Sequence, residues 1–130
     1  MARRLISTPD APQSPLFAQG VRVGNQIHVS GMTGLDTVTG ELAGPGVVEQ
    51  SLQAMANCER VVAAGGGTHD DVVEVGGLLA RPDDFAGLNE AFAQHFPVDP
   101  PARYVARLGP EIPGVLVSVR MTAVLEPGTP

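Results

Sequence analysis

Two arginines in one short segment are the side chains best suited to binding a small anion. The segment PARYVARLGPE, residues 101–111, places Arg103 and Arg107 four positions apart on a stretch with the composition of a β-strand. Alternate side chains of a strand point to the same face, so the two guanidinium groups share one face. A guanidinium binds a carboxylate through two parallel hydrogen bonds, which predicts a site for a small organic acid. The spacing equally fits arginines that reach solvent or pair with acidic residues at a subunit contact.

The composition excludes several classes of function. The 130 residues carry a formal net charge of −6, and all 8 cationic residues are arginine. An acidic chain lacks the basic surface that neutralises phosphates, so we expect no nucleic-acid partner. Without lysine, Schiff-base chemistry on the chain is excluded. No apolar run reaches the roughly 20 residues of a membrane span, so we expect no membrane partner.

The cysteine and the histidines indicate neither a disulfide nor a metal centre. Cys58 is the single cysteine, which fits a reducing compartment, and we expect a cytoplasmic protein with Cys58 in its core. The histidines, His28, His69 and His95, lack the spacing of metal ligands. The three glycines at 65–67 end a predicted helix rather than open one, so they form no phosphate loop. We therefore expect no metal and no cofactor.

The predicted elements form one α+β domain over residues 1–130. Apolar residues recur at helical spacing from Val47 to the glycines at 65–67, and again after Asp83, which we expect to cap the second helix. Strands are predicted at residues 3–8, on both sides of a turn at 24–25, and at 71–80, 102–108 and 115–125. This order predicts a mixed sheet with two helices on one face.

The last predicted strand separates the two faces of that sheet. Its odd positions from Val115 to Leu125 are all apolar, so this face should lie under the helices. Strand 71–80 is apolar on both faces, so the uncovered side of the sheet needs a second covering surface, and we expect an oligomer. If the polar faces of the other strands lie on the uncovered side, one region contains His28, Ser30, Arg103, Arg107, Ser118 and Arg120.

Four motifs in order resemble those of the Rid/YjgF family, also called the L-PSP endoribonuclease-like family. They are SPLFAQGVRVGNQIHVSG, EQSLQAMANCERVVAAGG, DDVVEVGGLLARPDDFAGLNEAF and PPARYVARL, and they span nearly the whole chain. The resemblance implies a chorismate-mutase-like fold and a homotrimer with a ligand pocket at each of its subunit interfaces. The deaminase branch of the family hydrolyses reactive enamines and imines, such as 2-aminoacrylate, to 2-oxo acids and ammonia.

The resemblance also assigns residues to the pocket. Arg103 of the P-A-R segment corresponds to the arginine that binds the substrate carboxylate, and Ser30-Gly31 to the S-G pair that lies against the ligand. Asn89 corresponds to the pocket asparagine of the second helix, although a helix-to-loop hydrogen bond explains that residue equally well. We expect Arg103 and Ser30 to act in catalysis.

The remaining pocket positions depart from the family pattern. Phe17 stands where a tyrosine is usual, Met32 where a glutamine is usual, and Val105 where the deaminase branch commonly has cysteine. Ser118 stands where that branch has a glutamate that handles water, and a serine cannot replace a carboxylate as a base at neutral pH. His28 and Glu111 are alternative candidates for the base. Arg107 and Arg120 are candidates for binding a second anionic group.

The sequence therefore supports three functions. The first is hydrolysis of a small enamine or imine carboxylic acid, with Arg103 holding the carboxylate. The second is a trimer that binds a small carboxylate without turnover, since the usual glutamate and tyrosine are missing. The third is a pathway-specific deaminase of a larger enamine acid, which the apolar Phe17, Met32 and Val105 would admit.

Overall fold

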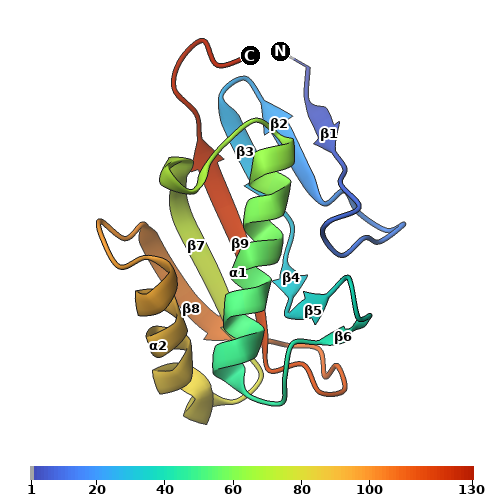
Figure 1. The fold of residues 1–130 in the computed structure, drawn as a ribbon, viewed down its shortest axis with the longest axis vertical. Helices are drawn as coiled ribbons and strands as arrows, with labels where there is room; N and C mark the ends of the chain where they lie inside the picture. Colours follow the sequence, from blue (N-terminus) through green and yellow to red (C-terminus); the bar gives the residue numbers. More distant parts are fainter. Residues whose placement is uncertain (1) are drawn as a thin grey trace.

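One mixed sheet carries most of the chain, and the computed structural model describes residues 2–130 (Figure 1). Its strands are β1 (Arg4–Ile6), β2 (Gly20–Val23), β3 (Gln26–Val29), β4 (Met32–Thr33), β7 (Val72–Leu79), β8 (Ala102–Arg107) and β9 (Val117–Val124). They lie in the order β1-β2-β3-β9-β7-β8, and β4 also pairs with β9. Only β7 and β8 run parallel, because α2 crosses between them; the other pairs are antiparallel. The sheet is therefore mixed, as predicted.

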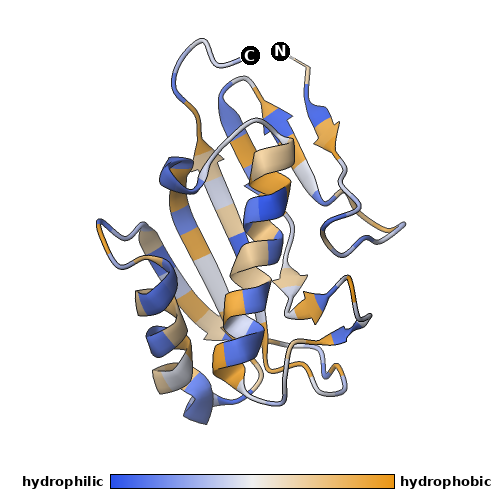
Figure 2. Cartoon of the chain, viewed as in Figure 1, coloured by the Kyte–Doolittle hydropathy of each residue, from blue (hydrophilic) through white to orange (hydrophobic). Residues whose placement is uncertain are grey.

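Two helices cover one face of this sheet. They are α1 (Val47–Ala64) and α2 (Phe85–His95), and α1 crosses the middle of the sheet while α2 lies over its β8 edge (Figure 1). In Figure 2 hydrophobic and hydrophilic bands alternate along α1, as expected of a helix with one buried side. The predicted α+β class with two helices on one face is confirmed. Of the helices within residues 2–130, none is long and apolar enough to span a membrane.

The core lies between the helices and the odd positions of β9, as predicted. Val117, Val119, Met121 and Ala123 are at most 1% exposed. The alternate residues of β9, from Ser118 to Val124, lie on the opposite face, which neither helix covers. We call this second side the open face. One face of the sheet thus packs against the helices, whereas the open face has no cover within residues 2–130. The surroundings of each polar residue therefore depend on which of the two faces carries it.

The ends of both helices depend on local chemistry. Glu49 accepts a hydrogen bond from the backbone N–H of Gly46 at 2.8 Å, which satisfies a donor at the start of α1. Gly66 ends the same helix with a φ of +99°, a conformation that favours glycine. The prediction that Asp83 caps α2 was wrong. A short 3-10 turn, η2 (Pro82–Asp84), precedes the helix, and Asp84 occupies the cap position with its carboxylate bound to Arg81 at 3.0 Å.

The segment between β4 and α1 contains a second small sheet. Its strands are β5 (Leu35–Asp36) and β6 (Glu41–Leu42), joined by a turn in which Gly40 has a φ of +77°. The turn between β2 and β3 falls at Gly24 and Asn25, as predicted, and Gly24 has a φ of +57°. A further 3-10 turn, η1 (His69–Asp71), leads into β7.

Candidate functional site

Arg103 lies on the helix-covered side of β8, beneath α2. Its Nη1 donates a hydrogen bond to Asn89 Oδ1 at 2.8 Å. Its guanidinium carbon lies 5.0 Å from the ring centroid of Phe92 and 5.8 Å from that of Phe85, so both rings face a cation. These contacts position the guanidinium group at the edge of the sheet. We call Phe85, Asn89, Phe92, Arg103 and Val105 the arginine group.

The pairing of β8 with β7 explains why Arg103 points toward α2. Paired residues of neighbouring strands place their side chains on the same face. Arg103 pairs with Val75, and Val75 pairs with Met121 of the buried face of β9. Tyr104 takes the opposite face, where its ring lies against Gly76; a Cβ at Gly76 would come within 2.3 Å of that ring. The absence of a side chain at Gly76 therefore makes room for Tyr104.

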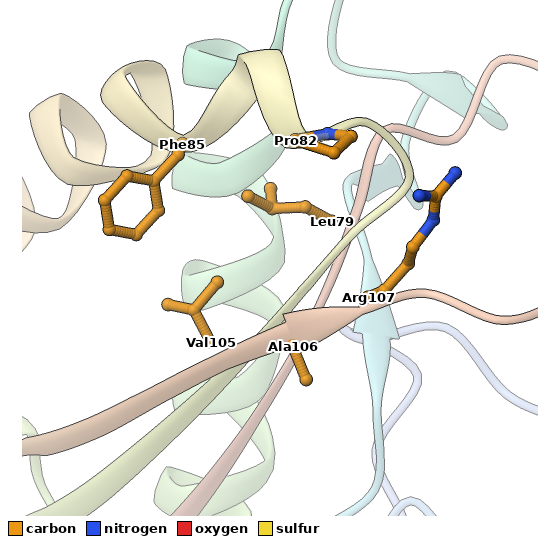
Figure 3. A pocket seen from close by; sticks show the side chains of 6 residues that line it. All are labelled: Leu79, Pro82, Phe85, Val105, Ala106 and Arg107. Carbon is orange, nitrogen blue, oxygen red and sulfur yellow. The ribbon is translucent and has the colours of Figure 1, made fainter.

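An apolar cleft of about 410 Å³ begins beside the arginine group. Figure 3 shows the side chains of Leu79, Phe85 and Val105 directed into the space between α2 and β8, with Ala106 on the other side of the strand. Phe85 belongs both to this cleft and to the arginine group, so the cleft continues from the guanidinium of Arg103. A ligand with an anionic end and a short apolar side chain would match this arrangement.

Arg107 lies at the far end of the cleft, and Glu111 lies beyond it. Arg107 lines the cleft and also borders a second hollow of about 400 Å³, which Glu111 and the loop after β8 help to form. In Figure 3 the guanidinium of Arg107 is directed toward the loop that carries Pro82. Both residues are exposed, so each is accessible to a ligand of the second hollow.

Ser30, Gly31 and Ser118 come together on the open face. His28 of β3 pairs with Thr122 of β9, and Met32 of β4 pairs with Val119 of the same strand. Four residue steps from His28 to Met32 therefore lie opposite three steps on β9, so the segment that joins β3 to β4 contains one extra residue. This irregularity is a β-bulge at Ser30-Gly31, a feature common next to functional sites. Ser30 donates its hydroxyl hydrogen to the carbonyl of Ala18 at 2.6 Å. A Cβ at Gly31 would lie 3.0 Å from Ser118 Oγ.

Phe17 lies in the loop before this bulge and is 54% exposed. Gln19 holds the loop in place: it is 5% exposed, and its amide donates to the carbonyls of Thr8, Ala11 and Pro12 at 2.9–3.0 Å. Ala18, between Phe17 and Gln19, connects this loop to the bulge, because its carbonyl accepts the hydrogen bond of the Ser30 hydroxyl. We call Phe17, Ser30, Gly31 and Ser118 the serine group.

The prediction that all six polar residues share one face of the sheet was wrong. His28, Ser30, Ser118 and Arg120 do lie on the open face, but Arg103 and Arg107 lie on the helix-covered side. Strand alternation shows which residues share a face, whereas the pairing register of β8 determines which face that is. Within one chain the sheet therefore separates the arginine group from the serine group.

Three other candidates belong to neither group. The side chain of Met32 is 3% exposed and lies in the core, opposite Val119, so it cannot contact a ligand. Arg120 is engaged within the chain, with Glu74 at 3.2 Å and with the hydroxyl of Thr122 at 2.8 Å. His28 is exposed and lies 3.2 Å from the side-chain oxygen of Gln26.

The two aromatic partners of Arg103, Phe85 and Phe92, were not recognised from the sequence. Phe85 is 48% exposed and faces the cleft, whereas Phe92 is partly buried and packs against the core. Leu88 and Ala91 are the fully buried residues of α2. The signal was present in the spacing, because Phe85, Asn89 and Phe92 recur at helical intervals and Asn89 was already a candidate.

The fold and these groups define a class of protein: a small α+β domain with two helices on one face and an arginine beside an apolar cleft. Residues 8–125 match the model of the family Endoribonuclease L-PSP. A 2-iminobutanoate/2-iminopropanoate deaminase of Capra hircus is 35% identical over 130 residues, which cover 99% of this chain and 95% of the relative. The chain belongs to this family, which is the Rid/YjgF family of the predicted resemblance.

Solved structures of the family have the same fold. RidA from the Antarctic bacterium Psychrobacter sp. PAMC 21119 is 32% identical with a TM-score of 0.85, covering 94% of this chain and 99% of that chain. E. coli TdcF with bound serine is 26% identical with a TM-score of 0.85, covering 95% of this chain and 99% of that chain. These similarities extend over nearly the full length of each protein.

Proposed function

We propose that this protein hydrolyses small 2-imino or enamine carboxylic acids to the 2-oxo acid and ammonia. The observation that carries the proposal is that one edge of the Arg103 guanidinium is free to bind a ligand. Asn89 binds one Nη1 hydrogen, and among residues 2–130 no acceptor hydrogen-bonds to Nε or Nη2. This edge of the guanidinium can therefore form the two parallel hydrogen bonds that a carboxylate accepts. The relative from Capra hircus is named for two such substrates, 2-iminobutanoate and 2-iminopropanoate.

The cleft supports a substrate with a short apolar side chain. When the carboxylate lies on Arg103, Phe85 and Val105 are the next side chains along the cleft. Methyl and ethyl groups gain from contact with such a surface, at about 0.8 kcal/mol for each buried CH2. TdcF, which binds serine in its structure, supports a ligand of similar size that carries a carboxylate.

The reaction needs little from the protein beyond orientation. Water adds to the electrophilic carbon of the C=N bond, the nitrogen takes up a proton, and ammonia leaves as the C=O bond of the 2-oxo acid forms. An imine is already reactive, so holding it beside a water supplies much of the acceleration. The hydroxyls of Ser30 and Ser118 are proposed to orient the water and the nitrogen. Neither serine is an effective base, so the proton passes through water or the substrate's own nitrogen.

We also propose that the site is completed by a second copy of the chain, in the homotrimer that the resemblance implies. The support is topological: the arginine group and the serine group lie on opposite sides of one sheet. Only two neighbouring chains could bring one group of each kind together. The open face also presents Leu78, Tyr104 and Val124, apolar side chains that a neighbouring subunit would cover.

Mixing two inactive variants tests the shared site. Arg103→Ala disables the arginine group, and Ser118→Leu fills the serine group without touching the core. Unfolded together and refolded at equal ratio, the two variants should regain about a quarter of the wild-type sites. An intact site needs its arginine group from a Ser118→Leu chain and its serine group from an Arg103→Ala chain, and each of these choices occurs in about half of the interfaces. Activity in the mixture, and a trimer mass by light scattering, are the measurements. A monomer, or no recovery from two folded trimers, would contradict the shared site.

The alternative is a trimer that binds a small carboxylate without turnover. Ser118 favours it, because a serine stands where the deaminase branch carries a glutamate. A larger enamine acid as substrate also remains open, and it would use the hollow beside Arg107. A ribonuclease, which the family name suggests, conflicts with the net charge of −6.

Turnover of freshly generated imines separates these functions. 2-Iminopropanoate and 2-iminobutanoate, made in situ by an amino-acid oxidase with catalase, should give the 2-oxo acid several times faster with the protein present. Trapping the remaining imine as its semicarbazone measures the rate. Saturable 2-oxo acid binding without acceleration of either imine would instead support the non-catalytic trimer, and the deaminase proposal would be abandoned.

Cys58 has no part in this mechanism. It is 0% exposed, and its thiol donates a hydrogen bond to the carbonyl of Val119 at 3.2 Å. Burial raises the pKa of its thiol far above the ordinary value, with a further contribution from the charge of Glu59, so no thiolate forms near neutral pH. As a cysteine outside any disulfide, it agrees with the cytoplasm as the proposed compartment.

A further inference from the structure

Three side chains from three different elements meet near the end of α2. Glu59 comes from α1, His69 from η1, and His95 from the last residue of α2. One ligand atom from each lies within 4.8 Å of the others. Glu59 Oε1 is 2.5 Å from His69 Nδ1 and 3.0 Å from His95 Nε2, so both imidazoles converge on one carboxylate oxygen.

The ring of His95 lacks a hydrogen-bond partner for a buried nitrogen. Its Nε2 is shut off from solvent, and although Glu59 Oε1 is near, the N–H direction is misaligned, so among residues 2–130 this atom forms no hydrogen bond. Most buried polar atoms in folded proteins are satisfied. His95 Nε2 and Glu59 Oε1 are thus close to each other without a hydrogen bond between them, an arrangement that suits an ion bound by both atoms.

The two imidazoles are also held in place before any ion binds. The ring of Phe96 stacks on His69 with centroids 4.8 Å apart and an angle of 22°, and it meets His95 edge-on, also at 4.8 Å. Phe96 itself is 5% exposed and belongs to the core. Fixed rings reduce the entropy lost when a ligand set closes on an ion.

The surroundings of the cluster also favour a cation. Glu59 supplies a carboxylate oxygen, a donor found in zinc sites, close to both imidazoles. The chain as a whole carries a formal charge of −6, which adds a long-range attraction for cations.

We propose that Glu59, His69 and His95 form a binding site for a divalent transition-metal ion, with Zn²⁺ the best match. Two imidazole nitrogens and one carboxylate oxygen are donors that zinc accepts, and three protein ligands leave one position for water. Binding requires His69 to leave Nδ1 unprotonated and to carry its hydrogen on Nε2. Small side-chain shifts then suffice, since zinc lies 2.0–2.2 Å from such donors.

The ion would join the end of α2 to α1 and η1, which lie well before it in the sequence. On α2, His95 lies six residues beyond Asn89, and none of the three proposed ligands belongs to the arginine group. The role of the ion would be to fix the end of α2 against α1 and η1. The site does not rest on the proposed deaminase activity, and either inference can fail without the other.

Zinc titration of the full-length, chelator-treated protein tests the site. In competition with a chromophoric chelator, we expect one Zn²⁺ per chain, and X-ray absorption should show only nitrogen and oxygen neighbours at 2.0–2.2 Å. Mg²⁺, which prefers oxygen ligands and keeps its water, should not compete. No zinc bound at one equivalent, or sulfur neighbours, would overturn the proposal.

Single variants show whether the bound ion occupies this cluster. His69→Gln and His95→Gln should each weaken zinc binding at least tenfold, whereas the matched control His28→Gln, an exposed histidine outside the cluster, should bind as the wild type does. Zinc should raise the Tm of the wild type and of His28→Gln but not of the other two variants. His69 is 44% exposed at its side chain, so its variant should fold normally. Equal affinity in His69→Gln and the wild type would place the ion elsewhere.

Discussion

Replacing Arg103 by alanine should lower kcat/KM for 2-iminopropanoate by about two orders of magnitude. Hydrogen bonds to a charged group contribute roughly 1.5–3 kcal/mol each, and the proposal gives the carboxylate two of them. A loss of about 3 kcal/mol corresponds to roughly a 150-fold change. The rate of 2-oxo acid release at low substrate concentration measures the effect.

Arg103→Lys and Arg107→Ala are the matched controls. Lysine keeps the charge but not the planar fork, so most of the loss should remain. Arg107 lies on the same face of β8, four residues further on, and its removal should change kcat/KM by less than about threefold if the substrate has one carboxylate. A wild-type rate in Arg103→Ala, with the fold intact by circular dichroism, would refute carboxylate binding by this arginine. A large effect of Arg107→Ala alone would indicate a substrate with a second anionic group.

Replacing Gln50 by leucine should lower the free energy of unfolding by about 3–5 kcal/mol. Gln50 is 0% exposed, and its amide donates to the carbonyls of Gly44 and Gly114 at 2.9 Å. Its oxygen accepts a hydrogen bond from the backbone N–H of Leu116, also at 2.9 Å. Each backbone group left unpaired in a buried place costs about 1–3 kcal/mol. Urea unfolding followed by circular dichroism measures the change.

Gln53→Leu is the control for this prediction. Gln53 lies one turn further along α1 and donates one hydrogen bond, to the side chain of Asn57 at 2.9 Å. It is half-buried, so its loss should cost under about 1 kcal/mol. Equal stability of Gln50→Leu and the wild type would show that water reaches the three backbone groups. Gln50 links the loop before α1 to the loop that enters β9, the strand that carries Ser118 of the serine group.

Much of the fold could be predicted because its elements are marked locally. The first helix begins at Val47 as predicted and ends at the predicted glycines, since the periodicity and Gly66 act within a few residues. The alternation of β9 likewise showed which of its residues form the core. The start of α2 was misplaced because Pro82 and the pair of Arg81 with Asp84 form a turn there, a choice between two adjacent aspartates that propensity does not resolve.

By itself, the sequence determined the main helices and strands, the family and which residues share a face of each strand. Only the tertiary structure decided whether a given strand face lies under the helices or on the open face. The parallel pairing of β8 with β7 turns Arg103 toward α2 and away from Ser30. The same applies to Glu59, His69 and His95, which showed no motif in the chain. Local periodicity acts over a few residues, whereas strand register and helix packing act between residues that are distant in sequence.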